Sequence, residues 1–419
     1  MKKILDLYFK TSLIIRILIG LAIGIVLGLY LPQASFVTVF GDVFVGALKA
    51  VAPILVFVLV ISSLANAGKG IGKRFGTVIM FYIVSTLIAA IVAVIGSFIF
   101  KITVPLVVDG AQQTPPSSLL EVLKNLLNNI TQNPVLSLST GNYIGILTWA
   151  IIFGIALRKL ASDGTKSVMS DISDAVSLSI GAIIQFAPFG ILGLVFSSIN
   201  EYGLAIFIDY GKLVLLLVGC MLTVSLLVNP LIALIAMRKN PYPLLFKCLK
   251  ESGVTAFFTR SSAANIPVNM DLCERLGLER EYYSVAIPLG ATINMDGAAI
   301  TITIMTLAAA FTQGISVDIF SAVILSFLAT LGACGASGVA GGSLLLIPMA
   351  CSLFGISQDV AMQVVSIGFI IGVIQDSLET ALNSTGDVFF AAVSEFKDKL
   401  KNGEKIEFFE KNNKCTGDK

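Results

Sequence analysis

The sequence contains no histidine and little charge: only 13% of its 419 residues are Asp, Glu, Lys or Arg. A soluble domain carries about 25% charged residues, so this chain lacks the polar surface that a soluble globule needs. The absence of histidine excludes Ser-His-Asp and Cys-His catalysis, HExxH metalloproteases and imidazole metal sites. A formal net charge of +2 is too small to drive binding to nucleic-acid phosphates. These absences exclude an ordinary soluble protein, a disordered chain and a nucleic-acid binder.

Two other kinds of motif are missing. None of the six cysteines forms a CxxC pair, and most lie in apolar stretches, which predicts buried thiols rather than a disulfide framework or a zinc site. No GxxxxGK[ST] run occurs, so the sequence gives no support for coupling to ATP hydrolysis.

What the sequence has is long apolar runs, and hydrophobic types make up 56% of it. A spanning helix needs about 20 mostly apolar residues. The first run is interpreted as a transmembrane helix and not a removable signal peptide, because it is long enough to span and no small-residue cleavage site follows a short core. Eight spans are predicted, near 13–32, 41–66, 75–103, 143–157, 176–199, 211–237, 282–312 and 357–392.

Basic residues set the predicted orientation. They gather in alternate connections, whereas the polar 104–142 segment has only Lys124 and the 200–210 segment has none. The positive-inside rule then places both termini in the cytoplasm. Two further segments, 251–270 and 318–356, are apolar or rich in small residues but are broken by Ser, Gly or Pro. Basic loops flank only the first, so the two are predicted to enter from opposite faces, as in an inverted repeat around a midplane site.

The two broken segments carry possible ligand-binding groups. In the first, hydroxyls and free backbone N–H groups at Ser261-Ser262 can hold a carboxylate, although a plain polar turn fits the sequence equally well. The second, 332–343, is rich in glycine and predicts a mobile hairpin that covers a site, in preference to close helix packing.

Asp296 lies inside an otherwise uncharged run from Tyr283 to Phe311. Inserting a lone carboxylate there costs about 3 kcal/mol or more. The run Asn294-Met295-Asp296-Gly297 predicts an interrupted helix, whose freed carbonyls and carboxylate suit a hard cation such as Na⁺. Protonation of Asp296 is the alternative.

The last span has the densest polar pattern. At 100° per residue, Asp376, Thr380, Asn383 and Asp387 fall within about 40° of one another on a helix, with Glu379 to one side. Ionisable groups inside a membrane indicate function by default. The span is therefore predicted to line a binding site.

The order of these features resembles the dicarboxylate/amino-acid:cation symporter family, over essentially the whole chain and with high specificity over 255–390. An Arg-Ser-Ser hairpin tip is followed by an Asn-Met-Asp-Gly break, a glycine-rich hairpin and then Asp…Asn…Gly-Asp. Within the family, the stretches 333–343 and 375–384 look most like bacterial sodium:serine/threonine symporters.

The resemblance implies an all-α polytopic membrane protein with the glutamate-transporter fold: eight transmembrane helices plus two re-entrant hairpins with inverted repeats. The family assembles as a homotrimer, in which a scaffold holds a transport domain that moves like an elevator. The implied scaffold consists of 1–75 (spans 1–2) and 143–210 (spans 4–5). The implied transport domain consists of 76–103 (span 3), 211–250 (span 6) and 251–395 (both hairpins and spans 7 and 8). An extracellular loop is implied at 104–142 and a cytoplasmic tail at 396–419.

The family motif also implies roles for individual residues. Asp376 binds the α-amino group of the substrate, and Asn383 binds its α-carboxylate. The carboxylate site is completed by Ser261, Ser262, Ala336, Ser337 and Gly338. The implied Na⁺ ligands are Tyr82, Ser85, Thr86, Asn294, Asp296, Asn383 and Asp387. Without the resemblance, the pattern alone would assign the three hydroxyl residues within 82–86 to the core or the lipid interface.

The departures from the family pattern concern specificity. Glu379 stands where glutamate and aspartate carriers place an Arg, so an acidic substrate would meet a like charge at a cost of several kcal/mol. Thr380 is expected to contact a substrate hydroxyl, and Arg260, the nearest fixed cation, is predicted to pair with Glu379. Ala263 and Ala298 replace hydroxyl residues of the family, so the resemblance does not extend to the family's highest Na⁺ stoichiometry.

The predicted function is that of a secondary active symporter that imports L-serine and L-threonine with the Na⁺ gradient. It is expected to lie among the lipids of a bacterial inner membrane, with no enzymatic activity, organic cofactor or nucleic-acid partner. The alternative is a proton- or sodium-coupled C4-dicarboxylate or acidic amino-acid carrier, which Glu379 disfavours. An intramembrane aspartyl protease using Asp296 and Asp376 leaves the hairpins unexplained, and a channel lacks a filter repeat.

Overall fold

The computed structural model describes residues 11–66, 73–106, 127–334, 341–404, 406 and 408, and all regular structure within these ranges is helical. Eight stretches in this part of the chain are long and apolar enough to cross a membrane, which makes the protein an integral membrane protein. These stretches contain α2 (Leu13–Tyr30), α3 (Thr38–Asn66), α4 (Lys73–Ile99), α7 (Tyr143–Leu160), α8 (Asp163–Gln185), α10 (Ile206–Thr223) with α11 (Asn229–Met237), α15 (Arg280–Ile293) with α16 (Asp296–Thr312), and α19 (Gln358–Lys401).

The fifth predicted span, a continuous helix over 176–199, is wrong. The chain instead forms α8, which ends at Gln185, and a separate α9 (Ala187–Tyr202). Pro188 lies in the first turn of α9, where its missing N–H costs nothing, but it cannot continue α8. The break therefore follows from a proline that hydropathy alone does not register.

The N-terminal helices pack closely through glycine. Gly20, Gly24 and Gly28 recur every four residues along α2 and are buried against α9. A Cβ atom at Gly24 would lie 2.7 Å from the carbonyl oxygen of Leu192. This spacing lets the two backbones approach as small residues do between membrane helices. Helices α2, α3, α7, α8 and α9 form one group of neighbouring helices.

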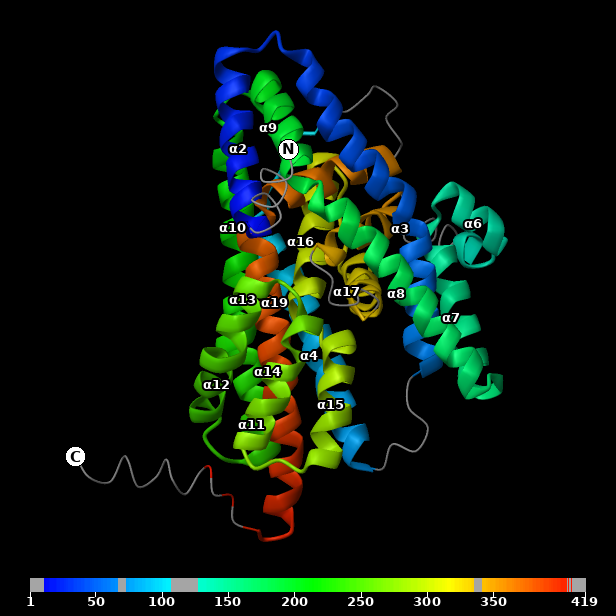
Figure 1. The fold of residues 1–419 in the computed structure, drawn as a ribbon, viewed down its shortest axis with the longest axis vertical. Coiled ribbons are helices and arrows are strands. Elements are labelled where there is room, and N and C mark those ends of the chain that lie inside the picture. The colour runs from blue at the N-terminus through cyan, green and yellow to red at the C-terminus, as the bar shows by residue number, and fades with distance from the viewer. Residues whose placement is uncertain are drawn as a thin grey trace, which may run out of the picture.

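The long helix α19 runs through the middle of the remaining helices (Figure 1). It packs against α4, α15 and α16, and against both arms of the first broken segment. These arms are α12 (Tyr242–Cys248), the π-helical turn η3 (Leu249–Gly253) and α13 (Val254–Thr259) on one side, and α14 (Ser262–Arg275) on the other. Helix α4 and the continuous region from α12 to α16, which lie far apart in the sequence, thus meet along α19.

Both broken segments are interrupted helices, as predicted. In the first, α13 ends and α14 begins around Arg260 and Ser261, and Arg260 has a positive φ of 53°. In the second, α17 (Ile319–Ala333) comes before residues 335–340, which lie outside the described residues, and η4 (Gly342–Leu346) and α18 (Ile347–Ser352) come after them. The break between α15 and α16 falls at Asn294 and Met295, where the sequence predicted it.

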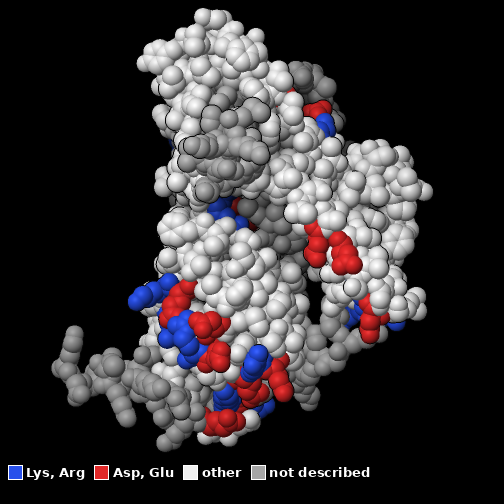
Figure 2. Space-filling view, viewed as in Figure 1, with Lys and Arg blue, Asp and Glu red and all other residues white. Residues whose placement is uncertain are grey.

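The polar 104–142 segment is partly helical, which the prediction of a plain loop missed. Within it, α6 (Pro134–Thr140) begins at an Asn133 cap and ends at Gly141 with φ 68°. In the view of Figure 2, charged side chains gather toward the lower end, over α12 and α14, whereas the upper part is almost uncharged. Acidic side chains also lie at mid-height on the right, over α8, and the wide uncharged surface fits a molecule embedded in lipid.

Candidate functional site

Asp296, the first residue of α16, is fully buried. Its carboxylate accepts hydrogen bonds from Ser85 Oγ at 2.7 Å, Thr86 Oγ1 at 3.0 Å and Asn229 Nδ2 at 3.0 Å. In the described part of the chain no Lys or Arg pairs with it. Neutral donors alone compensate its burial, which leaves its negative charge available for a bound cation.

A second buried carboxylate lies next to the first. Asn294, at the helix break, donates from Nδ2 to Asp387 Oδ1 at 3.1 Å and to the carbonyl oxygen of Asn383 at 3.0 Å. Tyr82 donates to the carbonyl oxygen of Asp387 at 3.0 Å. Asp387 Oδ2 is buried and has no hydrogen-bond partner among the described residues. The predicted Na⁺ ligands are thus brought together as a set of buried oxygens, the donor type that a hard cation prefers.

Asn383 connects the helix break to α19. Its Oδ1 accepts a hydrogen bond from the backbone N–H of Gly297 at 2.8 Å, and its Nδ2 lies 3.4 Å from Met295 Sδ. Gly297 itself has no room for a side chain, because a Cβ atom there would lie 2.8 Å from Glu379 Cα. This close approach of α16 to α19 places the oxygen cluster directly beside the acidic residues of α19.

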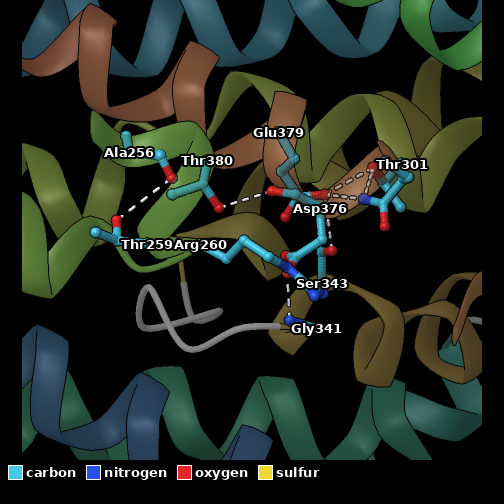
Figure 3. Close-up of polar contacts among 10 residues, drawn as sticks. Ala256, Thr259, Arg260, Thr301, Gly341, Ser343, Asp376, Glu379 and Thr380 are labelled. Carbon is cyan, nitrogen blue, oxygen red and sulfur yellow. Dashed lines mark hydrogen bonds and ion pairs between the residues drawn. The ribbon is translucent and has the colours of Figure 1, made fainter. Parts of the chain in front are cut away.

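Asp376 is the centre of a second polar group (Figure 3). Its Oδ2 accepts a hydrogen bond from Arg260 Nε at 2.7 Å and forms an ion pair with Nη2 at 2.6 Å. Its Oδ1 accepts from the backbone N–H of Gly341 at 3.1 Å. One carboxylate on α19 therefore contacts both broken segments near their tips.

The predicted ion pair between Arg260 and Glu379 is corrected by this geometry: Arg260 pairs with Asp376. Glu379 is buried, and its Oε2 accepts hydrogen bonds from Thr301 Oγ1 at 2.7 Å and Ser343 Oγ at 2.9 Å. Gln375 Nε2 is a third donor to the same oxygen. The carboxylate of Glu379 is directed toward α16 and η4, so it lies away from the guanidinium.

The remaining predicted substrate ligands are placed as follows. Thr380 Oγ1 donates to the carbonyl oxygen of Asp376 at 2.8 Å, so its hydroxyl proton is used within α19. Ser261 caps α14 by accepting from the N–H of Ala264 at 3.2 Å, and Ser262 is buried beside it. The predicted ligands Ala336, Ser337 and Gly338 lie outside the described residues.

A scan against known families decides the relationship, because the model of the sodium:dicarboxylate symporter family matches residues 13–396. The chain belongs to this family. The resemblance seen in the sequence motifs is confirmed, and with it the glutamate-transporter fold. Two similar relatives are named serine/threonine transporter SstT. The one from Bifidobacterium adolescentis is 55% identical over 404 residues, 96% of this chain and 94% of the relative. The one from Streptococcus agalactiae serotype III is 57% identical over 396 residues, 94% of this chain and 98% of the relative.

These relatives are named as transporters and not as enzymes, in agreement with the expectation for this symporter-family chain.

Several polar residues of the site were not predicted from the sequence. Asn229, a lone amide in an apolar span just before Pro230, carried a readable signal. Thr301 and Ser343 did not, since single hydroxyls are common in packed membrane helices. Gln375 directly precedes Asp376, the first residue of the polar stripe of α19, and its side chain donates a hydrogen bond to Glu379.

Proposed function

We propose that this protein is a secondary active symporter that imports L-serine and L-threonine together with Na⁺. The observation that carries the proposal is the pair of buried carboxylates on α19, Asp376 and Glu379: among the described residues Arg260 pairs with Asp376, and no cation pairs with Glu379. Such a site attracts an ammonium group and repels a side-chain carboxylate. The names of the relatives, at 55% and 57% identity, point to the same substrates.

In the proposed complex Asp376 binds the α-ammonium group. Asn383, the tip hydroxyls of Ser261 and Ser262 and the backbone of the second broken segment at 336–338 hold the α-carboxylate. Support for this orientation comes from the N-terminus of α14, which begins at Ser262 and presents backbone N–H groups to an anion. Thr380 Oγ1 keeps its lone pairs and accepts from the substrate hydroxyl.

Na⁺ is the proposed co-transported ion. One site uses Tyr82, Ser85, Thr86, Asn294 and Asp296, and the other uses Asn294, Asn383 and Asp387. Asn383 supports coupling between ion and substrate, since it bonds the N–H of Gly297 beside Asp296 and is also a proposed substrate ligand. An ion that orders the break between α15 and α16 would therefore also order the substrate site.

The proposed movement is that of an elevator within a homotrimer in the bacterial inner membrane, with both termini cytoplasmic. The scaffold consists of 1–75 and 143–210, and the transport domain of 76–103, 211–250 and 251–395. Support comes from the packing: α2, α3, α7, α8 and α9 neighbour one another, whereas α19 gathers α4, the broken segments and α15–α16.

The test is uptake of radiolabelled L-serine into proteoliposomes, with and without an inward Na⁺ gradient, challenged by excess threonine or aspartate. We expect Na⁺-dependent uptake that threonine blocks and aspartate does not. The second candidate is a carrier of acidic substrates, because the family is described as sodium:dicarboxylate symporters. Inhibition of serine uptake by aspartate would favour this candidate. Absence of serine uptake under any cation gradient would refute the proposed substrate.

A further inference from the structure

Arg260 occupies a conspicuous place in the fold. It ends α13 at the tip of the first broken segment, and its backbone N–H bonds the carbonyl oxygen of Ala256 at 2.9 Å. It is one of two non-glycine residues with positive φ in the described part of the chain. A branched, bulky or long side chain is rarely held in this left-handed conformation without a reason. The side chain is also buried, with only 8% of the residue exposed.

The contacts of Arg260 explain this placement. Nε donates to Asp376 Oδ2 at 2.7 Å and Nη2 forms an ion pair with the same oxygen at 2.6 Å, whereas the buried Nη1 has no hydrogen-bond partner among the described residues. The guanidinium is therefore committed to one oxygen and is not locked into a wider network (Figure 3).

The same oxygen is the proposed partner of the substrate's ammonium group. An ammonium group and the edge of a guanidinium present the same chemistry to a carboxylate, namely positive charge with more than one N–H donor. Asp376 is only 2% exposed, so its Oδ2 has no open side for a second cation. Two cations on one buried carboxylate would also repel each other.

We propose that Arg260 is a tethered substitute for the ammonium group of the substrate, and that a small neutral amino acid binds by displacing it from Asp376. This inference rests on the proposed function, because it takes the transported amino acid as the displacing ligand. It assigns Arg260 a role in specificity: only a ligand with its own ammonium group can take the place of the guanidinium without leaving Asp376 buried and unpaired. It also means that binding breaks the ion pair that joins the tip of the first broken segment to α19.

The experiment measures equilibrium binding of two ligands to the purified full-length protein in NaCl by calorimetry. The ligands are L-serine and 3-hydroxypropanoate, which is serine without its ammonium group. The variants are R260Q, R260G, whose glycine suits the positive φ, and R260K, which keeps a cation. The matched control is R275Q, which removes a guanidinium from the same broken segment, where Arg275 is half exposed and pairs with Glu251 and Asp271 away from the site.

We expect R260Q and R260G to bind serine about tenfold more tightly than wild type, since the competing cation is gone, and to gain nothing for 3-hydroxypropanoate. R275Q should bind serine as wild type does, and R260K, which keeps a competing cation, should bind serine more weakly than R260Q and R260G. Equal or weaker serine binding by R260Q and R260G would overturn the inference while leaving the proposed function standing, because Arg260 would then be a positioning residue. If the wild type binds neither serine nor threonine, the proposed function falls and the inference falls with it.

Discussion

Replacement of Glu379 by Gln should weaken the discrimination against acidic substrates. Asp376 and Glu379 are three residues apart on α19, so their side chains start about 5–6 Å from each other. For a substrate held at Asp376 by its ammonium group, we take this same spacing, about 5 Å, as the distance from its side-chain carboxylate to Glu379. At an effective dielectric constant of about 20 this repulsion is roughly 3 kcal/mol, or a factor on the order of 100 in affinity.

The assay is inhibition of Na⁺-driven serine uptake by aspartate and by threonine. In E379Q, the concentration of aspartate that halves uptake should fall by roughly two orders of magnitude relative to that of threonine. A change in threonine inhibition alone would mean that Glu379 acts on the substrate hydroxyl. Glu281, an exposed acid in the first turn of α15, supplies the control E281Q, which should leave both inhibitors unchanged. An unchanged aspartate-to-threonine ratio in E379Q would refute the electrostatic reasoning.

Two further predictions concern other parts of the fold. N229A removes a donor to the buried carboxylate of Asp296, a bond to a charged group worth about 1.5–3 kcal/mol. It should raise the Na⁺ concentration for half-maximal serine uptake about tenfold or more, and an unchanged Na⁺ dependence would remove Asn229 from the ion site. G24L forces a side chain toward α9, because a Cβ atom at this position would lie 2.7 Å from the carbonyl oxygen of Leu192. It should cost about 1–3 kcal/mol by overpacking and lower the thermal midpoint, whereas G46L, where no atom lies within 4 Å of the Cβ position, should not.

The parts of the site that follow a helical repeat could be predicted from the sequence. Asp376, Asn383 and Asp387 share a face of α19 because one helix continues from Gln358 to Lys401. The interruption at Asn294 and Met295 was also readable, because an acid and amides are expensive inside an apolar helix.

Choices between partners far apart in sequence could not be predicted. Arg260 lies 116 residues from Asp376, and its selection of this acid over Glu379 depends on how the tip of the first broken segment meets α19. Hydroxyls of α16 and η4 then satisfy Glu379. The reach of Asn229 to Asp296 follows from the π-helical turn at Val224–Val228, which shifts the face that the next residues present.

The central claim is that the Na⁺ gradient does work on serine. The most direct test is the ratio of internal to external L-serine in proteoliposomes under an inward Na⁺ gradient, measured before and after an ionophore collapses that gradient. We predict a ratio that rises above one and returns to one when the gradient is lost. A ratio that never exceeds one with Na⁺, or that follows a proton gradient instead, would contradict the account.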